Sequence, residues 1–476
     1  MKNNNIYKEK ALKIFEFAAR NVPAYKKLLA EYGINPKIII KNRDFEGIPI
    51  IDKKNYLLAF PPLQLVPKGK YPPMLSASSG SSGKPFYWPR GDAQEASGAE
   101  IHRIILENIF KLKGKTVLAI VCFSMGNWIA GTFTLASLRE VARKDKHFKL
   151  TTITPGIDKE DAVGALRDLA PYFDSVVVLG YPPFIMDVIL AARELGVNLE
   201  KLDLYFILAG ENFSEKWRSM LLKTAGAAQA LNKVVSIYGT ADAGALGHEN
   251  PFTVTLRRLA SKHKDLKKDL FGQSAFLPTV VAFYPEGAFF EVVNGNLILT
   301  TSAGIPLVRY DIKDHGMLLS HQYVISLLKK HKLYKILPAY LKNWRQPMAV
   351  LQGRQDVAVT FYAVNIYPEN IKAGLEDDRV AGLVTGKYVI VAEQTENLRE
   401  QKLKVAVELK KGINTNTDLV KIITSSLFDN LIELNTEYRK LSRSINQKAM
   451  PEVSLVEYGH EQFIIKKSKH RWVRQT

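Results

Sequence analysis

The chain has 476 residues, 46% of them hydrophobic and 24% charged, which excludes a disordered, collagenous or coiled-coil protein. Its one cysteine, Cys122, excludes an internal disulfide and any zinc site with two thiolates. The formal net charge of +19 fits partners rich in phosphate, namely small molecules, nucleic acid or membrane surfaces, although a lysine-rich composition alone produces the same charge.

The beginning of the chain is typical of two helices. Apolar residues recur at helical spacing over 7–31, and we expect Pro23 to separate the two helices. The longest apolar stretch, 176–190, is interrupted by Pro182, Pro183 and Asp187 and is too short to cross a bilayer. We therefore predict a cytoplasmic protein without membrane insertion.

The middle of the chain alternates between apolar strands and helical patterns. The expected strands cover 116–123, 174–179 and 204–209, and the expected helices cover 158–170 and 184–195. Near-continuous apolar strands are buried on both faces, so this alternation predicts a parallel sheet covered by helices. After residue 275 the pattern changes to antiparallel elements, with a hairpin of 289–293 and 296–301 around Asn294-Gly295.

The last third contains a basic stretch and a domain boundary. Residues 319–345 follow a helical pattern rich in lysine, and both a solvated helix face and a membrane-surface helix fit it. A break at Gln352-Gly353 divides the chain into 1–352 and 353–476. The expected fold class is α/β: a large N-terminal domain with mixed and parallel sheets covered by helices, then a small α+β domain on a hinge. The small domain has expected strands at 388–392 and 404–408 and a helix near 416–446.

A loop rich in serine and glycine lies at 76–85. Its two glycines allow tight turns that aim backbone N–H groups inward, and hydroxyls and a lysine add further donors. The expected phosphate-binding residues are Ser78, Ser79, Gly80, Ser81, Ser82, Gly83 and Lys84. The loop is not a Walker A motif, because that motif requires glycine at position 78 and serine or threonine at position 85. A flexible linker is the alternative interpretation.

This loop resembles the phosphate loop of the adenylate-forming superfamily, which contains acyl-CoA synthetases, peptide-synthetase adenylation domains and luciferase. Two upstream segments, Val-Pro-Ala-Tyr at 22–25 and Ile-Pro-Ile-Ile-Asp-Lys at 48–53, resemble the phenylacetate–CoA ligase branch in particular. Four later segments match in the same order, so the resemblance covers nearly the whole chain.

One of these segments, Tyr-Gly-Thr-Ala-Asp at 238–242, is similar to the family's Tyr-Gly-x-(Ser/Thr)-Glu motif. The resemblance implies that Tyr238 packs on adenine, next to Gly239 and Thr240. It also implies that Asp242 is catalytic and holds Mg²⁺ near the α-phosphate, since Mg²⁺ prefers carboxylate oxygens. The sequence departs from the motif at Ala241, which lacks a hydroxyl, and at Asp242, which is one methylene shorter than glutamate.

Three further segments match the nucleotide site. Gly210 and Glu211 resemble a segment that lines adenine, and their alternative role is a simple turn between strand and helix. In Arg-Tyr-Asp-Ile-Lys-Asp at 309–314, the resemblance implies that Asp314 accepts hydrogen bonds from both ribose hydroxyls. A solvated turn in which Asp311 and Asp314 pair with Arg309 is the alternative there. At 353–356 the resemblance implies that Arg354 contacts the nucleotide and that Asp356 is the hinge between domains.

The C-terminal region carries two weaker matches. Residues 363–371 resemble the branch's Gly-Val-Asn motif, but Ala363 replaces the glycine that lies beside the thiol channel in the family. The resemblance also implies a catalytic lysine that contacts the acid carboxylate. We assign it to Lys469, with Lys466 and Lys467 as alternatives.

Other residues were considered for the acid pocket and for zinc. Aromatic residues after the expected strands form either the acid pocket or part of the core: Phe123, Trp128, Tyr181 and Phe184. Some relatives place zinc ligands near His248 and Glu249, but with Cys122 as the single thiol we expect no zinc, and we assign Cys122 to the core.

The resemblance implies a two-step reaction. ATP activates a carboxylic acid, aromatic or otherwise hydrophobic, to an acyl-adenylate with release of pyrophosphate, and the acyl group then passes to a thiol, with coenzyme A as the expected acceptor. The implied cofactors are ATP, Mg²⁺ and coenzyme A, in a monomer or homodimer without a nucleic-acid partner. Transfer to an amine or a carrier-protein thiol is one alternative. A nucleotide-binding homologue without ligase activity is another, since positions 241, 242 and 363 depart from the motifs.

Overall fold

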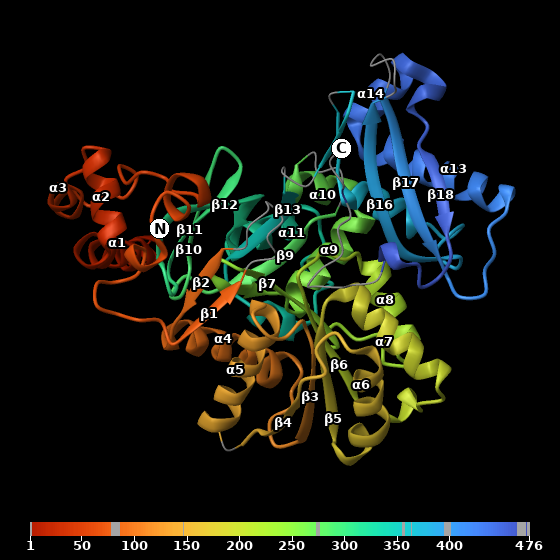
Figure 1. Cartoon of the computed structure of the whole chain (residues 1–476), viewed down its shortest axis with the longest axis horizontal. Coiled ribbons are helices and arrows are strands. Elements are labelled where there is room, and N and C mark those ends of the chain that lie inside the picture. The colour runs from red at the N-terminus through yellow and green to blue at the C-terminus, as the bar shows by residue number, and fades with distance from the viewer. Residues whose placement is uncertain are drawn as a thin grey trace. The chain divides into compact units, whose positions relative to one another are not determined.

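The computed structural model forms two compact units (Figure 1), each described here by itself. The described residues are 2–77, 86–145, 147–272, 277–354, 358–362, 364–394, 401–463 and 473. The first unit comprises Met1–Asn212, Leu221–Lys262 and Thr279–Leu351, and the second comprises Phe213–Met220, His263–Pro278 and Gln352–Thr476. Within the described ranges, every helix is too short or too polar to cross a membrane.

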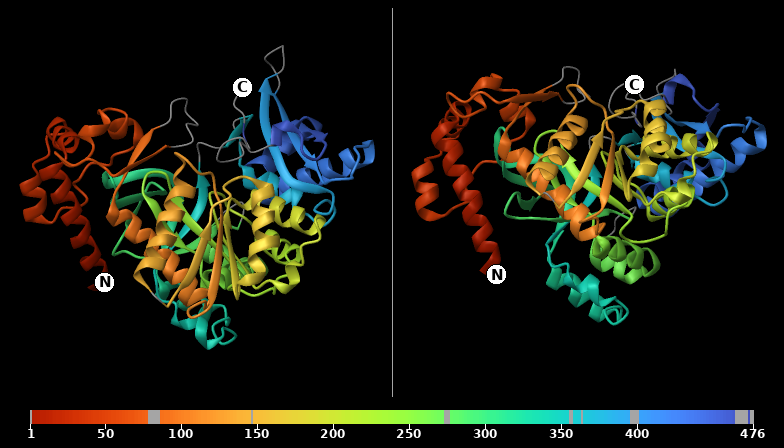
Figure 2. Two further views of the ribbon diagram at one scale, coloured as in Figure 1. Left: turned by 60° about the horizontal axis from the view of Figure 1, so that its bottom comes forward. Right: turned by 90° about the horizontal axis from the view of Figure 1, so that it is seen from below.

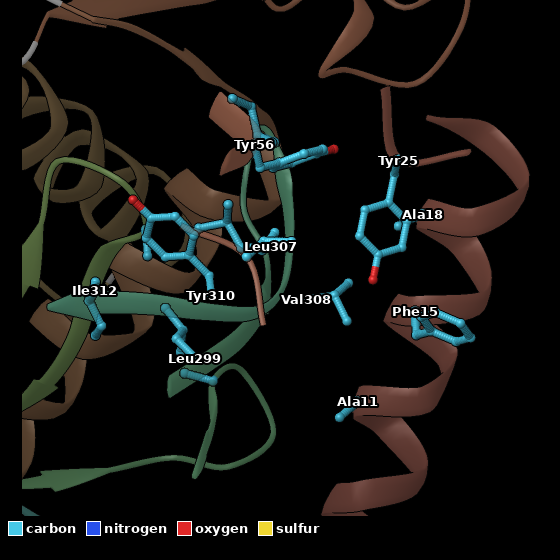
Figure 3. Close-up of a cluster of buried hydrophobic side chains, with 14 of the residues drawn as sticks. Ala11, Phe15, Ala18, Tyr25, Tyr56, Leu299, Leu307, Val308, Tyr310 and Ile312 are labelled. Atoms are coloured by element: carbon cyan, nitrogen blue, oxygen red, sulfur yellow. The ribbon is translucent and has the colours of Figure 1, made fainter. Parts of the chain in front are cut away.

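The first unit begins with three helices, α1 (Lys2–Asn21), α2 (Pro23–Glu31) and α3 (Pro36–Asn42). The predicted separation at Pro23 is confirmed, because proline is favoured in the first turn of a helix, where its missing N–H has no partner to lose. Ala11, Phe15 and Ala18 recur at helical spacing and are buried. Figure 3 shows them beside Tyr25 in one apolar cluster that also contains residues of the sheet.

The sheet of the first unit has eleven strands in the order β10-β11-β12-β13-β9-β8-β7-β6-β5-β3-β4. The strand bounds are β3 (Thr116–Cys122), β4 (Lys149–Ile153), β5 (Ser175–Gly180), β6 (Leu204–Ala209), β7 (Val234–Thr240), β8 (Gly244–His248), β9 (Thr279–Phe283), β10 (Phe289–Val293), β11 (Asn296–Ser302), β12 (Pro306–Leu319) and β13 (Met348–Arg354). Strands β3 to β7 are parallel. Strands β3, β5, β6 and β7 are buried along most of their length, as their apolar sequences predict, whereas the edge strand β4 is partly exposed. The pairs β7–β8, β8–β9, β9–β13, β10–β11 and β11–β12 are antiparallel, and β10–β11 is the predicted hairpin.

Helices cover the parallel half of this sheet (Figure 2). Their bounds are α4 (Asp92–Ile104), α5 (Ile129–Lys144), α6 (Lys159–Gly164), α7 (Pro182–Glu194) and α9 (Pro251–Lys262). From β3 the chain moves outward to β4 through α5, and then returns past β3 to β5 through α6. The direction of winding therefore reverses between β3 and β5, and ligands of such sheets bind beyond the carboxyl ends of the strands at that point.

A separate two-stranded hairpin, β1 (Met74–Ala77) and β2 (Tyr87–Arg90), precedes α4. Its register pairs Ala77 with Tyr87, so the two ends of the predicted phosphate loop are held side by side. Ala77 also forms a bridge to Trp128, and its N–H donates to the carbonyl of Asn127 at 2.6 Å. The hairpin thereby fixes both ends of the loop next to the start of α5.

The second unit contains the helices α8 (Glu215–Thr224, in part) and α10 (Lys264–Phe271) and the C-terminal part of the chain. The C-terminal elements are β14 (Val359–Phe361), β15 (Val364–Ile366), α12 (Pro368–Leu375), β16 (Val384–Gln394), β17 (Gln401–Leu409), α13 (Thr417–Leu434), α14 (Thr436–Ile445) and β18 (Glu452–Val456). The single helix expected near 416–446 is two helices. The side chain of Asn435 accepts a hydrogen bond from the N–H of Tyr438 at 3.0 Å and begins α14.

Candidate functional site

The carboxyl ends of the parallel strands bring several predicted site residues to one edge of the sheet. Phe123 follows β3, Tyr181 follows β5, Gly210 follows β6 and Tyr238 lies near the end of β7. Because neighbouring parallel strands end at the same edge, these positions are neighbours in space although they are far apart in sequence.

A hydrogen bond links the predicted adenine and ribose residues. The hydroxyl of Tyr238 donates to Oδ2 of Asp314 at 2.6 Å, across 76 positions of sequence. Tyr238 is 9% exposed, and its ring centroid lies 6.4 Å from that of Phe290. The structure therefore brings together two residues that the motifs assign to adjoining parts of one nucleotide.

The alternative for Asp314, a turn paired with Arg309, does not match the contacts of that arginine. Arg309 Nε donates to Oε2 of Glu291 at 3.1 Å, and Nη1 donates to the carbonyls of Glu46 and Ile48 at 2.5 and 2.7 Å. Asp311 instead accepts a hydrogen bond from Lys313 Nζ at 2.8 Å. The guanidinium of Arg309 is thus committed to Glu291 and to the backbone of Glu46 and Ile48.

The upstream branch segment 48–53 supports the strand that carries Asp314. The N–H of Ile51 donates to the carbonyl of Arg309 at 3.1 Å, and the N–H of Asp311 donates back to Ile51 at 2.8 Å. Lys313 Nζ also lies 3.0 Å from Asp52. Burial raises the pKa of Asp52, but hydrogen bonds from the backbone of Asn55 and from Lys313 outweigh it and hold the pKa below the usual value. This segment therefore braces β12 immediately before the ribose residue.

Asp242 lies in a turn that is closed by its neighbours. The hydroxyl of Thr240 accepts a hydrogen bond from the N–H of Ala243 at 3.1 Å. The hydroxyl of Tyr310 donates to Oδ2 of Asp242 at 2.7 Å. A Cβ at Gly239 would lie 2.9 Å from the carbonyl oxygen of Gly244, so glycine is required where the two strands approach. The motif thus positions its carboxylate through a tyrosine of β12.

Arg90 is a site residue that the sequence interpretation missed. Its side chain is 1% exposed, and its Nη2 donates to the carbonyl of Ala241. Burial lowers the pKa of Arg90 to about 9, while the charge of Asp242 acts in the opposite direction. Among the described residues, neither its Nε nor its Nη1 has a hydrogen-bond partner. The sequence signal was a basic residue that ends the strand directly after the predicted phosphate loop, but burial cannot be read from that position.

Asp242 was also predicted to hold Mg²⁺. The described ranges contain no cluster of three or more histidine, cysteine, aspartate or glutamate residues arranged for a metal ion. Mg²⁺ at a nucleotide site is commonly held by one or two carboxylates together with phosphate oxygens and water. A single carboxylate fixed by Tyr310 therefore fits an ion that the nucleotide brings with it, and does not fit one held by the protein alone.

A second contact joins the predicted adenine segment to the predicted acid pocket. The hydroxyl of Tyr181, directly after β5, donates to Oε2 of Glu211, the second residue after β6. Gly210, between β6 and Glu211, has a φ of 97°, a left-handed conformation that favours glycine. The turn after β6 therefore directs Glu211 toward the neighbouring strand end.

The other predicted pocket residues lie in different surroundings. Phe123 is buried in the apolar cluster on the sheet, and Phe184 is buried on α7. Trp128 is half-buried at the start of α5, beside Ala77. Of the four aromatic residues, Tyr181 and Trp128 are the two whose contacts link them to other predicted site segments.

Several predicted residues lie outside the described ranges, and their placement is untested. They comprise the phosphate loop (Ser78, Ser79, Gly80, Ser81, Ser82, Gly83 and Lys84), Asp356, Ala363, Lys466, Lys467 and Lys469. Arg354 is the last residue of β13, but its side chain is not described.

The residues considered for zinc form a buried polar cluster. His248 Nδ1 lies 2.7 Å from the carbonyl oxygen of Glu249, so this nitrogen carries the proton, and Nε2 accepts from the hydroxyl of Tyr284 at 2.9 Å. The carboxylate of Glu249 pairs with Arg257 at 3.0 Å. Cys122 is buried, and burial raises the pKa of its thiol to about 12, so the thiol is neutral.

The titration of His248 makes the free energy of unfolding of the chain depend on pH. Burial lowers the pKa of His248 to about 4, whereas an unfolded histidine titrates near 6.5. Below pH 6.5 the unfolded chain therefore binds the proton first, so the stabilisation present above pH 6.5 is lost as the pH falls toward 4. We expect the free energy of unfolding in urea to drop by about 2 kcal/mol between pH 7 and pH 4.5 from this residue. The matched control His248→Asn, which keeps a donor for Glu249, should show a drop smaller by that amount, and an identical drop would contradict the assignment.

Comparisons with known proteins show which solved structures share this fold. No family model and no curated protein sequence matches the chain. Among solved structures, it is similar to a 2-hydroxyisobutyryl-CoA ligase in its postadenylation state with 2-HIB-AMP, with a TM-score of 0.70, 16% identity, and coverage of 100% of this chain and 90% of that one. The same ligase in its thioesterification state, with 2-HIB-AMP and CoA, gives a TM-score of 0.56 at 16% identity, covering 100% and 90%. An anthranilate–CoA ligase with anthranoyl-AMP gives 0.52 at 13% identity, covering 83% and 65%. The chain therefore has the fold of these CoA ligase structures, in agreement with the predicted α/β fold class.

Proposed function

We propose that this chain is an AMP-forming acid–thiol ligase, similar to the phenylacetate–CoA ligase branch. The observation that carries the proposal is the pair of contacts Tyr238–Asp314 and Tyr310–Asp242. Two motifs far apart in sequence meet there, at the sheet edge where this fold class binds ligands. The likeness to acid–CoA ligase structures over the whole chain supports it.

Binding of ATP is assigned to three groups of residues, one each for the phosphates, the adenine and the ribose. The loop from Ser78 to Lys84 offers backbone N–H groups, hydroxyls and one positive charge to the phosphates. Tyr238 offers its ring to adenine, next to Gly210 and Glu211. Asp314 offers its carboxylate to the ribose hydroxyls, and its bond from Tyr238 holds it in register with the base.

In the first half-reaction, a carboxylate oxygen of the acid bonds to the α-phosphorus. The bond from that phosphorus to the bridging oxygen breaks, and pyrophosphate leaves with the electron pair. The α-phosphate gains negative charge on the way, and fixed charges in a buried site stabilise it without reorganising. Arg90 supplies such a charge beside Asp242. Asp242 would hold Mg²⁺ together with the phosphates, and the ion would supply positive charge that offsets theirs.

In the second half-reaction, the acceptor thiol releases its proton to solvent and its sulfur bonds to the acyl carbon. The bond from that carbon to the phosphate oxygen breaks, and AMP leaves with the electron pair. Coenzyme A is the proposed acceptor. Three residues of the C-terminal domain, 353–476, have proposed roles. Arg354 contacts the nucleotide, Asp356 is the hinge, and Lys469 contacts the acid carboxylate during adenylation. Rotation of that domain between the two steps is part of the proposal.

The substrate is proposed to be an aromatic or otherwise hydrophobic acid. Tyr181 contacts Glu211, and Trp128 lies beside Ala77 at the start of the predicted phosphate loop. Aromatic side chains at these positions favour an apolar acyl group. By the resemblance, Ala363 replaces a glycine that lies beside the thiol channel in the family, and an extra methyl group there would leave less room for a pantetheine arm. An amine or a carrier-protein thiol is therefore the alternative acceptor.

Acid-dependent exchange of labelled pyrophosphate into ATP tests the proposal. We expect exchange with at least one acid of a panel of aryl and alkyl acids, because the adenylate forms reversibly before any acceptor binds. The same acid, mixed with coenzyme A, amines or carrier proteins, should then give a thioester with coenzyme A. An amide or a carrier-bound product would establish the alternative acceptor. Binding of ATP without exchange for any acid would leave a nucleotide-binding protein and overturn the ligase assignment.

A further inference from the structure

A basic excursion leaves the sheet between β12 and β13, and Figure 2 shows it projecting from the first unit in both views. It contains α11 (His321–Lys330) and a short helical turn, Ala339–Asn343. The sequence pattern predicted one helix over 319–345, whereas α11 ends at Lys330. Lys332 has a φ of 60°, and Pro338 cannot continue a helix, so the rest of the segment forms turns.

The excursion has one sign of charge. Between Asp314 and Asp356 the chain contains no aspartate or glutamate. The cations of the excursion are Lys329, Lys330, Lys332, Lys335, Lys342 and Arg345. Lys332, Lys335 and Arg345 are exposed. The segment itself contributes no acidic side chain, so the exposed Lys332, Lys335 and Arg345 present positive charge to an anionic surface.

The same segment exposes apolar side chains at its turn. Ile336 is 63% exposed and Tyr340 is 56% exposed, with Pro338 and Ala339 also exposed between them. These four residues lie within five positions of sequence, and each of them is exposed. Leu337, which lies between Ile336 and Pro338, and Leu341, which follows Tyr340, are both buried and anchor the turn to the protein. The apolar tip is therefore defined as Ile336, Pro338, Ala339 and Tyr340.

Lysines are ordered around this tip. Lys329 Nζ, at the end of α11, lies 5.2 Å from the ring centroid of Tyr334, and Lys342 Nζ lies 4.5 Å from the same ring. These cation–π contacts connect the end of α11 to the helical turn on the other side of the tip. The tip is thus a braced loop, flanked on both sides by cations.

From these features we infer that the apolar tip and its lysines dock on a membrane surface that contains anionic phospholipids. Lysines attract the headgroups, while aliphatic and tyrosine side chains enter the interface between headgroups and acyl chains. A purely acidic protein surface, without apolar residues, would satisfy the lysines but would bury neither Ile336 nor Tyr340 in apolar surroundings. The inference goes beyond the proposed function and does not depend on it.

Co-sedimentation of the full chain with lipid vesicles tests the inference. We expect binding to vesicles of phosphatidylcholine mixed with phosphatidylglycerol, little binding to phosphatidylcholine alone, and weakening at high salt. The double variant Lys332→Glu with Lys335→Glu should lower the partition coefficient by about tenfold or more. The double variant Ile336→Ser with Tyr340→Ser should lower it at low and high salt alike, because it removes the apolar contribution.

The matched control is Lys26→Glu with Lys27→Glu on α2, two exposed lysines of the same unit outside the excursion. It should bind as the unaltered chain does, and the thermal unfolding midpoints of all variants should agree. Equal loss in the control would show nonspecific attraction by the net charge and overturn the inference. Equal binding to vesicles with and without phosphatidylglycerol would also overturn the inference. Absence of binding to either kind of vesicle would overturn it too, and would favour an acidic protein as the partner.

Discussion

An Asp242→Ala variant is expected to form acyl-adenylate at least about a hundredfold more slowly than the unaltered chain, which is the effect of removing one charge-stabilising group from a buried site. The carboxylate is fixed by the hydroxyl of Tyr310 and lies in the field of the buried Arg90. Its removal leaves that guanidinium without its nearby negative charge and removes the proposed Mg²⁺ ligand. The rate of acid-dependent pyrophosphate exchange measures the effect.

Two further variants separate the charge of Asp242 from its hydrogen bond. Asp242→Asn keeps an acceptor for Tyr310 but removes the charge, so it should be nearly as slow as Asp242→Ala. Tyr310→Phe removes the hydrogen bond at 2.7 Å and keeps the charge, so it should lose about tenfold or less. If Asp242→Asn exchanged pyrophosphate at the unaltered rate, the charge would have no role, and the assignment of Asp242 would be wrong. Thermal unfolding shows whether each variant is folded.

An Asp314→Ala variant should raise the KM for ATP by about tenfold to a hundredfold, with a smaller change in kcat. Hydrogen bonds to a charged acceptor contribute about 1.5–3 kcal/mol each, and ribose hydroxyls bind equally in the ground state and in the transition state. The effect on KM thus distinguishes Asp314 from Asp242, whose loss should act mainly on the chemical step. Steady-state exchange at varied ATP concentration measures both constants.

Asp311→Ala is the matched control for Asp314. Asp311 lies on the same strand three residues earlier, and its carboxylate bonds to Lys313 at 2.8 Å and to Asn296 Nδ2 at 3.2 Å. Its removal should leave the KM for ATP within about threefold of the value for the unaltered chain, since its carboxylate oxygens already accept hydrogen bonds from Lys313 and Asn296. Tyr238→Phe, which removes only the bond to Asp314, should give an intermediate KM. An unchanged KM in Asp314→Ala would reject the ribose assignment.

Local sequence determined the elements whose conformation depends on near neighbours. The hairpin at Asn294-Gly295 follows from two residues that tolerate left-handed conformation, and their φ angles are 51° and 81°. The break at Pro23 and the buried parallel strands follow from similarly local rules. The pattern failed where a single capping residue decided the outcome, since Asn435 divides one expected helix into two. It failed again after Lys330, where the apolar spacing continues but the helix does not.

The tertiary structure decided which of the site residues meet. Tyr238 and Asp314 are 76 residues apart, and Tyr310 and Asp242 are 68 apart, so their pairing depends on strand order and on closure of the intervening loops. The same holds for Tyr181 and Glu211, which adjoin because β5 and β6 are parallel neighbours. The burial of Arg90 depends on everything packed around it. Motifs in the sequence predicted most of these side chains, because a motif consists of residue types at a fixed spacing. Their contacts and the charge environment of Arg90 arise only when distant strands assemble into one sheet.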